Sequence, residues 1–256
     1  MLLHLCTWAE VEARLARSTG IILPIGSTEQ HGPNGLIGTD AICAEVFARA
    51  VGEAEDALVG PTINVGMAQH HLGFAGSMTL RPSTLIAVVR DMVQSLTRHG
   101  FDKFFFINGH GGNVATVTAA FSEIYAEHSL RRPNAANGDD VGNNALRPRC
   151  TIKNWWESEA AHRLSRELYG AEEGSHATPS EVSVTYYAYP EAIKSAEMSP
   201  RVAPSGRFTD STDYRSRFPD GRIGSNPALA SAEHGKRIVE AVTPDLAAAY
   251  RRFLAE

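Results

Sequence analysis

The sequence predicts an α/β protein in which helices cover both faces of a mostly parallel sheet. Two apolar runs, 21–25 and 103–107, are short enough to be strands that are buried on both sides. Segments with apolar residues at helical spacing separate such runs, and this alternation is typical of parallel sheets. The chain has 256 residues, an ordinary size for one α/β domain, and shows neither an internal repeat nor a linker. We therefore expect a single domain over residues 1–256.

Helices and strands are expected to alternate through the N-terminal half. Thr7 and Glu10 have the spacing of a capping box, which predicts that a helix begins directly after Thr7. Ser83 is a suitable N-cap for a later helix, and Gly100 is suited to ending that helix. In chain order, we expect a helix at 8–18, a strand at 21–25, a helix at 40–52, a short strand within 57–65, a helix at 84–99, a strand at 103–107 and a helix at 114–128.

The C-terminal half has weaker periodicity and longer polar stretches. Thr178 and Pro179 suit the N-cap and first position of a helix, and Pro244 is expected to kink or restart the last helix. In chain order, we expect an exposed loop or insertion at 129–148, a strand at 149–153, a helix at 157–169, a polar turn at 170–181, a helix at 179–188, a long loop over the active face at 199–227 and a helix at 229–254.

Composition narrows the classes of function. The net charge of −5 gives no reason to expect nucleic acid or an anionic membrane as a partner. No apolar run approaches the ~18 residues that span a bilayer, and charged residues interrupt the first 14 residues, so no signal peptide is expected. The three cysteines are widely spaced and predict neither a disulfide framework nor a CxxC metal site. We expect a cytoplasmic protein.

Three polar residues directly after the first buried strand point to a metal site. Glu29 and His31 are two positions apart, so in extended backbone their side chains can aim at a common point. Glycines and a proline then turn the chain, and Asp40 can return to the same point at the start of a helix. Two carboxylates and an imidazole suit a hard-to-borderline metal ion. Each residue alone is also compatible with a polar loop, but together they favour a metal site.

The second buried strand ends in Asn108-Gly109-His110-Gly111-Gly112-Asn113. Glycines let the backbone approach a bound group closely, and a helix beginning near Asn113 would direct its amide dipoles at that group. Ligands of parallel sheets lie beyond the carboxyl ends of the strands. His110 is therefore expected on the same face as Glu29, His31 and Asp40.

Other candidates are less specific. His176 and Glu181 lie five residues apart around a predicted helix start, so Glu181 is either a further ligand beside a catalytic His176 or a carboxylate that favours the helix dipole. Of the adjacent His70 and His71, at most one can face the site. Trp155 and Trp156 are interpreted as core residues rather than a substrate lid. The remaining histidines are treated as ordinary residues: His4, His99, His128, His162 and His234.

Three motifs make the sequence resemble the creatininase (creatinine amidohydrolase) family: GSTEQHGPNGLIGTD at 26–40, NGHGGN at 108–113 and HATPSE at 176–181. The later GSNPALASAEHGK at 224–236 is similar to the C-terminal region of that family. The resemblance implies a three-layer α/β/α fold, a hydrolase site with two metal ions, a small-molecule amide substrate and a homo-oligomer, often a hexamer.

The resemblance also implies roles for individual residues. Asp40 falls on the position that bridges the two metal ions, and His176 falls on the catalytic histidine. The positions of metal ligands are matched by Glu29, His31, Asp40, His110 and Glu181. Three carboxylates balance two divalent ions better than one, and a His/carboxylate set without cysteine suits Zn, Mn or Fe. Family members that open creatinine carry different residues at the positions of Gly112, Ser175 and Glu172.

The mechanism expected from this resemblance is attack by a metal-activated water on an amide carbonyl, such as that of a creatinine-type cyclic amide. Backbone N–H groups of Gly111 and Gly112 are expected to stabilise the oxyanion, and His176 to carry the proton to the leaving nitrogen. Three alternatives stay open. A formamide hydrolase or peptide-processing relative would share the metal ligands, and a metal-stabilised binding protein would lack catalysis. The third alternative is a nucleotide-binding module, although the sequence contains no glycine-rich phosphate-binding motif.

Overall fold

The computed structural model describes residues 1–130 and 147–256. Within these residues, four parallel strands form one sheet in the order β2-β1-β3-β4. The strands are β1 (Gly20–Ile25), β2 (Leu58–Val59), β3 (Lys103–Asn108) and β4 (Arg149–Asn154). The predicted strands are confirmed, although only two residues of the range 57–65 form a strand. Because all four run in one direction, their carboxyl ends lie at one edge of the sheet.

Both faces of the sheet are buried, as the apolar strands predicted. Successive side chains of a strand point to opposite faces. Ile22 and Phe105, which pair across β1 and β3, therefore belong to one apolar core, while their neighbours Ile21 and Phe104 belong to a second. All four side chains are fully buried.

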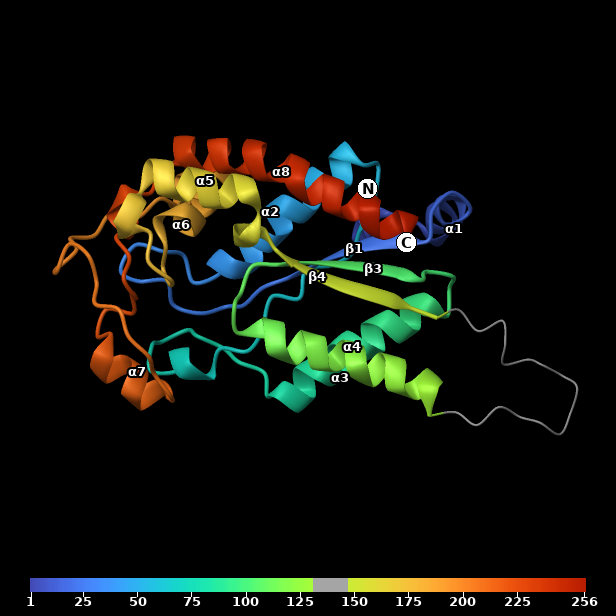
Figure 1. Ribbon diagram of the computed structural model, residues 1–256, viewed down its shortest axis with the longest axis horizontal. Helices are drawn as coiled ribbons and strands as arrows, with labels where there is room; N and C mark the ends of the chain where they lie inside the picture. Colours follow the sequence, from blue (N-terminus) through green and yellow to red (C-terminus); the bar gives the residue numbers. More distant parts are fainter. Residues whose placement is uncertain (131–146) are drawn as a thin grey trace, which may run out of the picture.

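Helices form a layer on each side of the sheet (Figure 1). The first layer contains α2 (Thr39–Ala54), α5 (Glu159–Leu168), α6 (Pro179–Ala188) and α8 (Ala232–Ala255). The second contains α3 (Pro82–Thr97) and α4 (Asn113–Ser129), while α1 (Trp8–Leu15) lies near the two termini and α7 (Ser211–Arg217) at the opposite end of the molecule. This is the predicted three-layer α/β/α fold.

Helix starts largely follow the sequence signals. Thr7 caps α1 in a capping box with Glu10, and Thr178 caps α6 in a capping box with Glu181. The prediction that Ser83 caps the third helix is wrong. That helix begins two residues earlier than expected, at Pro82, because the fixed φ of proline and its missing N–H suit the first helical position.

Two further predictions need correction. The stretch 199–227 is not entirely a loop, because Asp210 caps the short helix α7 within it. The last helix begins at Ala232 rather than 229, after the Ser231 cap, and continues through Pro244. Of the loop expected at 129–148, residues 131–146 lie outside the described part of the chain.

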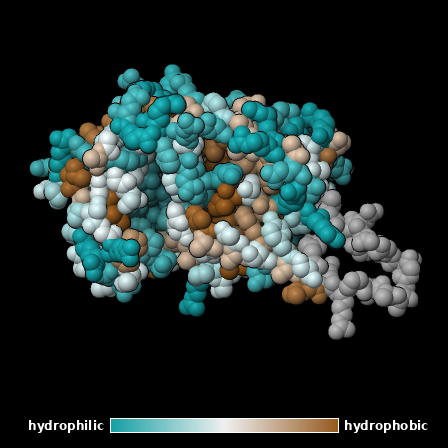
Figure 2. Space-filling view, in the orientation of Figure 1, coloured by the Kyte–Doolittle hydropathy of each residue, from teal (hydrophilic) through white to brown (hydrophobic). Residues whose placement is uncertain are grey.

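Hydrophilic side chains cover most of the face seen in Figure 2, and apolar side chains gather near its middle. Several large apolar side chains of the described residues are exposed, including Leu5, Trp8 and Leu130. Among the described residues, none of the helices combines the length and the apolar composition that crossing a membrane requires.

Candidate metal centre

The loops at the carboxyl ends of β1 and β3 meet at the N-terminus of α2. Glu29 and His31 lie in the first loop, His110 in the second, and Asp40 in the first turn of α2. The two loops pack so closely that a Cβ at Gly109 would clash with the backbone carbonyl of Asp40. Glycine at this position therefore allows the His110 loop to reach the same point as Asp40.

Four of the predicted side chains form one buried cluster. The Oδ1 atom of Asp40 lies 3.0 Å from Nε2 of His31, and its Oδ2 lies 2.9 Å from Nδ1 of His110. The Oε1 atom of Glu29 lies 3.2 Å from the same Nδ1 atom of His110. All four residues are at most 6% exposed. The convergence expected from the sequence is thus present.

Glu181 and His176 reach this cluster from α6 and the turn before it. The Oε1 atom of Glu181 lies 3.9 Å from Nε2 of His31 and also accepts a hydrogen bond from the backbone N–H of Thr178 at 2.6 Å. Glu181 is therefore both a helix-capping carboxylate and a member of the cluster. The Nδ1 atom of His176 lies 3.9 Å from Oε1 of Glu29.

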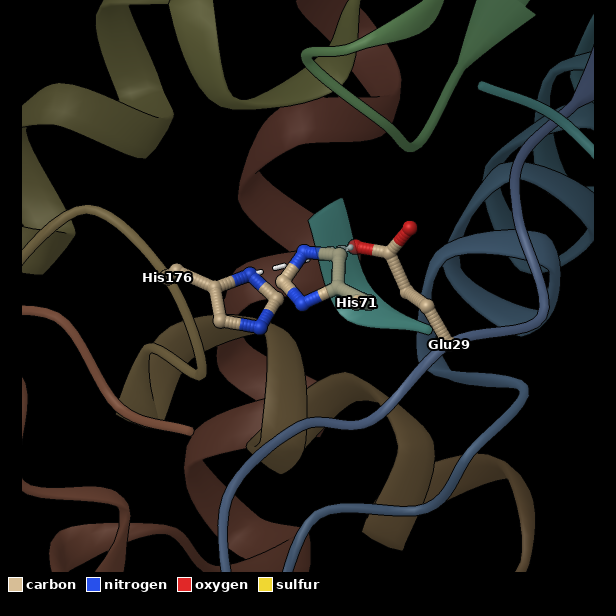
Figure 3. A group of neighbouring side chains, drawn as sticks. All are labelled: Glu29, His71 and His176. Carbon is tan, nitrogen blue, oxygen red and sulfur yellow. Dashed lines mark ion pairs between the residues drawn. The ribbon is translucent and has the colours of Figure 1, made fainter. Parts of the chain in front are cut away.

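His71 is a member of the cluster that the sequence did not single out. Figure 3 shows its imidazole between Glu29 and the ring of His176. Its Nε2 atom lies 3.1 Å from Oε1 of Glu29, and its ring centroid lies 4.4 Å from that of His176. His70 instead stacks on Phe208, with ring centroids 4.7 Å apart. Only one of the two adjacent histidines thus faces the site.

Backbone and amide groups fix the orientation of the imidazoles. The second ring nitrogens of His31 and His110 lie 3.0 Å from the carbonyl oxygen of Glu29 and 2.8 Å from that of Met67, respectively. The side-chain nitrogen of Gln30 lies 2.9 Å from ring nitrogens of both His71 and His176. Such outer contacts are typical of metal-binding histidines.

The donor set fits a cation. The Oε2 atom of Glu29 is buried and has no hydrogen-bond partner among the described residues. Oε1 of Glu29 and Oδ2 of Asp40 are also buried and lie beside imidazole nitrogens. Buried carboxylate oxygens are costly unless a charge or donor satisfies them. Three overlapping groups have ligand atoms within 4.8 Å of one another: Glu29, His31 and Asp40; His31, His176 and Glu181; and Glu29, His71 and His176.

The electrostatics of the cluster also favour positive charge at its centre. Burial alone would lower the pKa of His31, but Asp40, Glu181 and Glu29 raise it to about 10. Burial likewise opposes ionisation of Glu29, yet His110 and His71 hold the pKa of Glu29 well below its usual range. The carboxylate of Glu29 thus remains charged and attracts cations.

His176 and Glu181 behave differently. Burial, together with the nearby His71 and His31, holds the pKa of His176 well below its ordinary value. Burial raises the pKa of Glu181 to about 7, against the opposing effect of His31. A neutral imidazole at His176 can accept a proton, which suits a general base.

A cavity of about 590 Å³ opens beside the cluster. Trp155 and Trp156 both line it, but Trp155 is buried and stacks on Phe47, as expected of a core residue. Gly111 lines the cavity too, whereas Gly112 lies behind the ring of His110. The lining also includes Asp40, His110, His162, Ser165, Arg166, Glu173, His176 and Glu181.

Known proteins are similar to this chain over most of its length. The family model described as "Creatininase: Creatinine amidohydrolase" matches residues 4–250. A creatinine amidohydrolase from Pseudomonas putida is 26% identical over 96% of this chain and 94% of its own length. A mycofactocin precursor peptide peptidase from Mycolicibacterium smegmatis is 26% identical over 85% of this chain and 78% of its own length.

Solved structures share the fold. The structure of a mutant creatininase complexed with creatine superposes with a TM-score of 0.80 at 25% identity, covering 98% of this chain and 97% of the other. The family model spans nearly the whole chain, including every motif that surrounds the buried cluster. The chain therefore belongs to the creatininase family of hydrolases.

Proposed function

We propose that this protein is a metal-dependent amidohydrolase that hydrolyses the C–N bond of an amide. The observation that carries this proposal is the convergence of Glu29, His31, Asp40 and His110 on one buried point beside a cavity. With Glu181, these residues would hold two divalent ions. Zn, Mn or Fe suits this mixture of imidazole and carboxylate ligands.

Divalent ions in such a centre polarise a carbonyl group and lower the pKa of water from ~15.7 to about 7. The residues of the chain then orient the substrate and move protons. His176 is suited to carrying a proton to the leaving nitrogen, because its ring lies beside the carboxylate of Glu29 and its pKa is lowered. The backbone N–H of Gly111 borders the same cavity and is a candidate donor to the developing oxyanion.

A creatinine-type cyclic amide is one candidate substrate, as the name of the Pseudomonas putida relative suggests. A peptide or a formamide is the second candidate. The size of the cavity favours a peptide, and the identities of the relatives are compatible with one. The cavity of about 590 Å³ is in the range for ligands much larger than a single small ring. Relatives named for peptide processing match the chain at identities similar to that of the creatinine amidohydrolase.

Purified protein tests the proposal directly. Zinc- or manganese-loaded protein should release an amine from at least one member of a panel of creatinine, N-formyl compounds and short peptides, detected by product mass. Removal of the metal with a chelator should abolish the reaction, and metal addition should restore it. Tight metal binding without turnover of any amide would instead favour a metal-stabilised binding protein.

We also propose that the chain forms a homo-oligomer, with a hexamer favoured. Exposed apolar side chains such as Trp8 at 77% and Leu130 at 83% are available to such an interface. Light scattering coupled to size-exclusion chromatography should give a mass that is a multiple of 27.7 kDa. A mass equal to one chain would contradict the proposal.

A further inference from the structure

The cavity beside the candidate metal centre has a second wall, which α5 and the segment before it provide. His162 and Arg166 of α5 both line the cavity, together with Trp156 from the preceding segment. Residues four positions apart lie on the same face of a helix, so His162 and Arg166 face the cavity together. The same cavity reaches Asp40 and Glu181 on its other side. It therefore connects the metal-binding carboxylates to a wall that bears nitrogen donors.

The guanidinium group of Arg166 is available to a ligand. Arg166 is exposed, and within residues 1–130 and 147–256 it forms no ion pair. Its neighbour Glu167 pairs with Arg237 instead, with 2.6 Å between nitrogen and oxygen. A guanidinium carries five N–H donors in a planar fork that matches a carboxylate. Arg166 is thus suited to binding a carboxylate at the cavity.

Glu173 is the acidic residue on this wall, and its contacts limit its effect on an incoming anion. Its Oε1 atom accepts hydrogen bonds from the hydroxyls of Ser165, at 3.3 Å, and Ser180. Its Oε2 atom is buried away from solvent. Its hydroxyl partners thus engage Glu173 within the wall, and among the described residues Glu173 forms no ion pair with Arg166.

We propose that His162 and Arg166 bind a carboxylate of the substrate, so that the enzyme prefers amides with a free carboxylate remote from the scissile bond. This inference rests on the proposed function, in which the scissile amide lies at the metal centre. The substrate class is then a short peptide or an N-acylated amino acid with a free C-terminus. Trp156, half-buried on the same wall, supplies apolar contact for the part between the two ends.

Matched ligands of increasing length test this inference. The series is N-formylglycine and N-formyl oligoglycines of two to four residues, each as the free acid and as the C-terminal amide. Two of the three tryptophans of the chain line the cavity, so their fluorescence in metal-loaded protein reports binding without requiring turnover. At one length, the acid should bind roughly tenfold more tightly than its amide, as expected for a charge-assisted hydrogen bond.

Variants test whether residues of α5 cause the preference for the free acid over the amide. Arg166→Gln should remove the preference for the acid, Arg166→Lys should keep part of it, and His162→Asn should weaken it. Arg163→Gln is the matched control, because Arg163 is exposed on the same helix but does not line the cavity. If any of these amides is hydrolysed, Arg166→Gln should raise the KM of the acid and leave kcat nearly unchanged.

The outcomes separate this inference from the proposed function. Equal binding of acids and amides at every length, no binding of any ligand, or an unchanged preference in Arg166→Gln would overturn the inference. Hydrolysis without a preference for acids would leave the proposed function intact. A fluorescence-detected preference without any hydrolysis would support carboxylate recognition and count against the proposed chemistry. Thermal melts of each variant exclude unfolding as the cause.

Discussion

Asp40 contacts both halves of the candidate centre, since its two oxygens lie 3.0 Å from His31 and 2.9 Å from His110. We expect Asp40→Ala to lose bound metal and amide hydrolysis together. The loss of metal affinity should exceed the roughly 10- to 100-fold that is typical of removing an outer-sphere partner. Elemental analysis and turnover of the same preparation measure both effects, with Asp91→Ala as an exposed control. A variant that keeps its metal and full activity would remove Asp40 from the ligand set.

His176 is predicted to transfer protons rather than to bind the metal. His176→Ala should therefore keep its metal and lose roughly 10²- to 10⁴-fold in kcat, the usual contribution of a general acid or base. Metal content and kcat are measured on one sample, and His99→Ala serves as a control at an exposed histidine. Loss of the metal from His176→Ala would show that His176 is a ligand.

His71 is expected to orient Glu29 through the 3.1 Å contact between its Nε2 atom and the carboxylate. His71→Ala should then weaken metal binding roughly 10- to 100-fold, as is usual for outer-sphere partners. His71→Gln keeps a donor of similar reach to Nε2 and should recover part of that affinity. Competition with a chelator of known affinity measures both variants. Equal affinity in His71→Ala and the unmodified protein would contradict the assignment.

At this scale, the sequence identified the residues that follow strands but did not decide which of His70 and His71 faces the site. Glu29, His31, Asp40 and His110 were predictable because the carboxyl ends of parallel strands share one edge. His71 lies in the short 3-10 helix Gln69–His71, where no strand or helix periodicity fixes the direction of a side chain. Its alignment with Glu29 depends on contacts between distant segments.

The α6 helix is the element that presents Glu181. Thr178 caps it: the backbone N–H of Glu181 donates to the Thr178 hydroxyl at 3.2 Å, and the backbone N–H of Thr178 donates to the Glu181 carboxylate. Thr178→Ala should lower the free energy of unfolding by about 1 kcal/mol, the typical cost of losing such a cap. Thr178→Ser keeps the hydroxyl and should lose little. Urea denaturation of the metal-free proteins measures both, and equal losses in the two variants would contradict the capping role.

Elements with strong local signals were predicted well. The apolar strands around 21–25 and 103–107 and the N-caps at Thr7 and Thr178 agree with the structure. The helix α7 was missed because its seven residues are too few for a clear apolar period. Tertiary packing holds it instead, since Tyr214 is fully buried and its hydroxyl donates to the carbonyl of Gly221 at 2.8 Å.

Metal binding by the whole molecule is expected to depend on pH. Neighbouring carboxylates raise the pKa of His31 to about 10 and that of His110 well above its ordinary value, so both are protonated near pH 7 in the metal-free protein. A metal must displace these protons, so its apparent affinity should rise as pH increases from 6 to 9 and fall in acid. Calorimetric titration in buffers of different ionisation enthalpy should detect proton release. Uptake of protons, or affinity independent of pH, would contradict this expectation.

The three-layer architecture was predictable from the alternation of elements, but the shape of the cavity was not. Its walls come from α5, α6, the start of α2 and the segments after β3, β4 and α5. Their spacing depends on how two separate cores pack against the sheet. His162 illustrates this limit: no motif in the sequence distinguishes it from the other histidines, and only the packing of α5 brings it to the cavity.

The central claim is that side chains from distant parts of the chain jointly bind two divalent ions. A crystal structure of the manganese- or zinc-loaded protein, with anomalous scattering recorded at the metal edge, tests it most directly. We predict two anomalous peaks per chain within coordination distance of Glu29, His31, Asp40, His110 and Glu181. Peaks located elsewhere, or a single ion that Asp40 does not contact, would contradict the account.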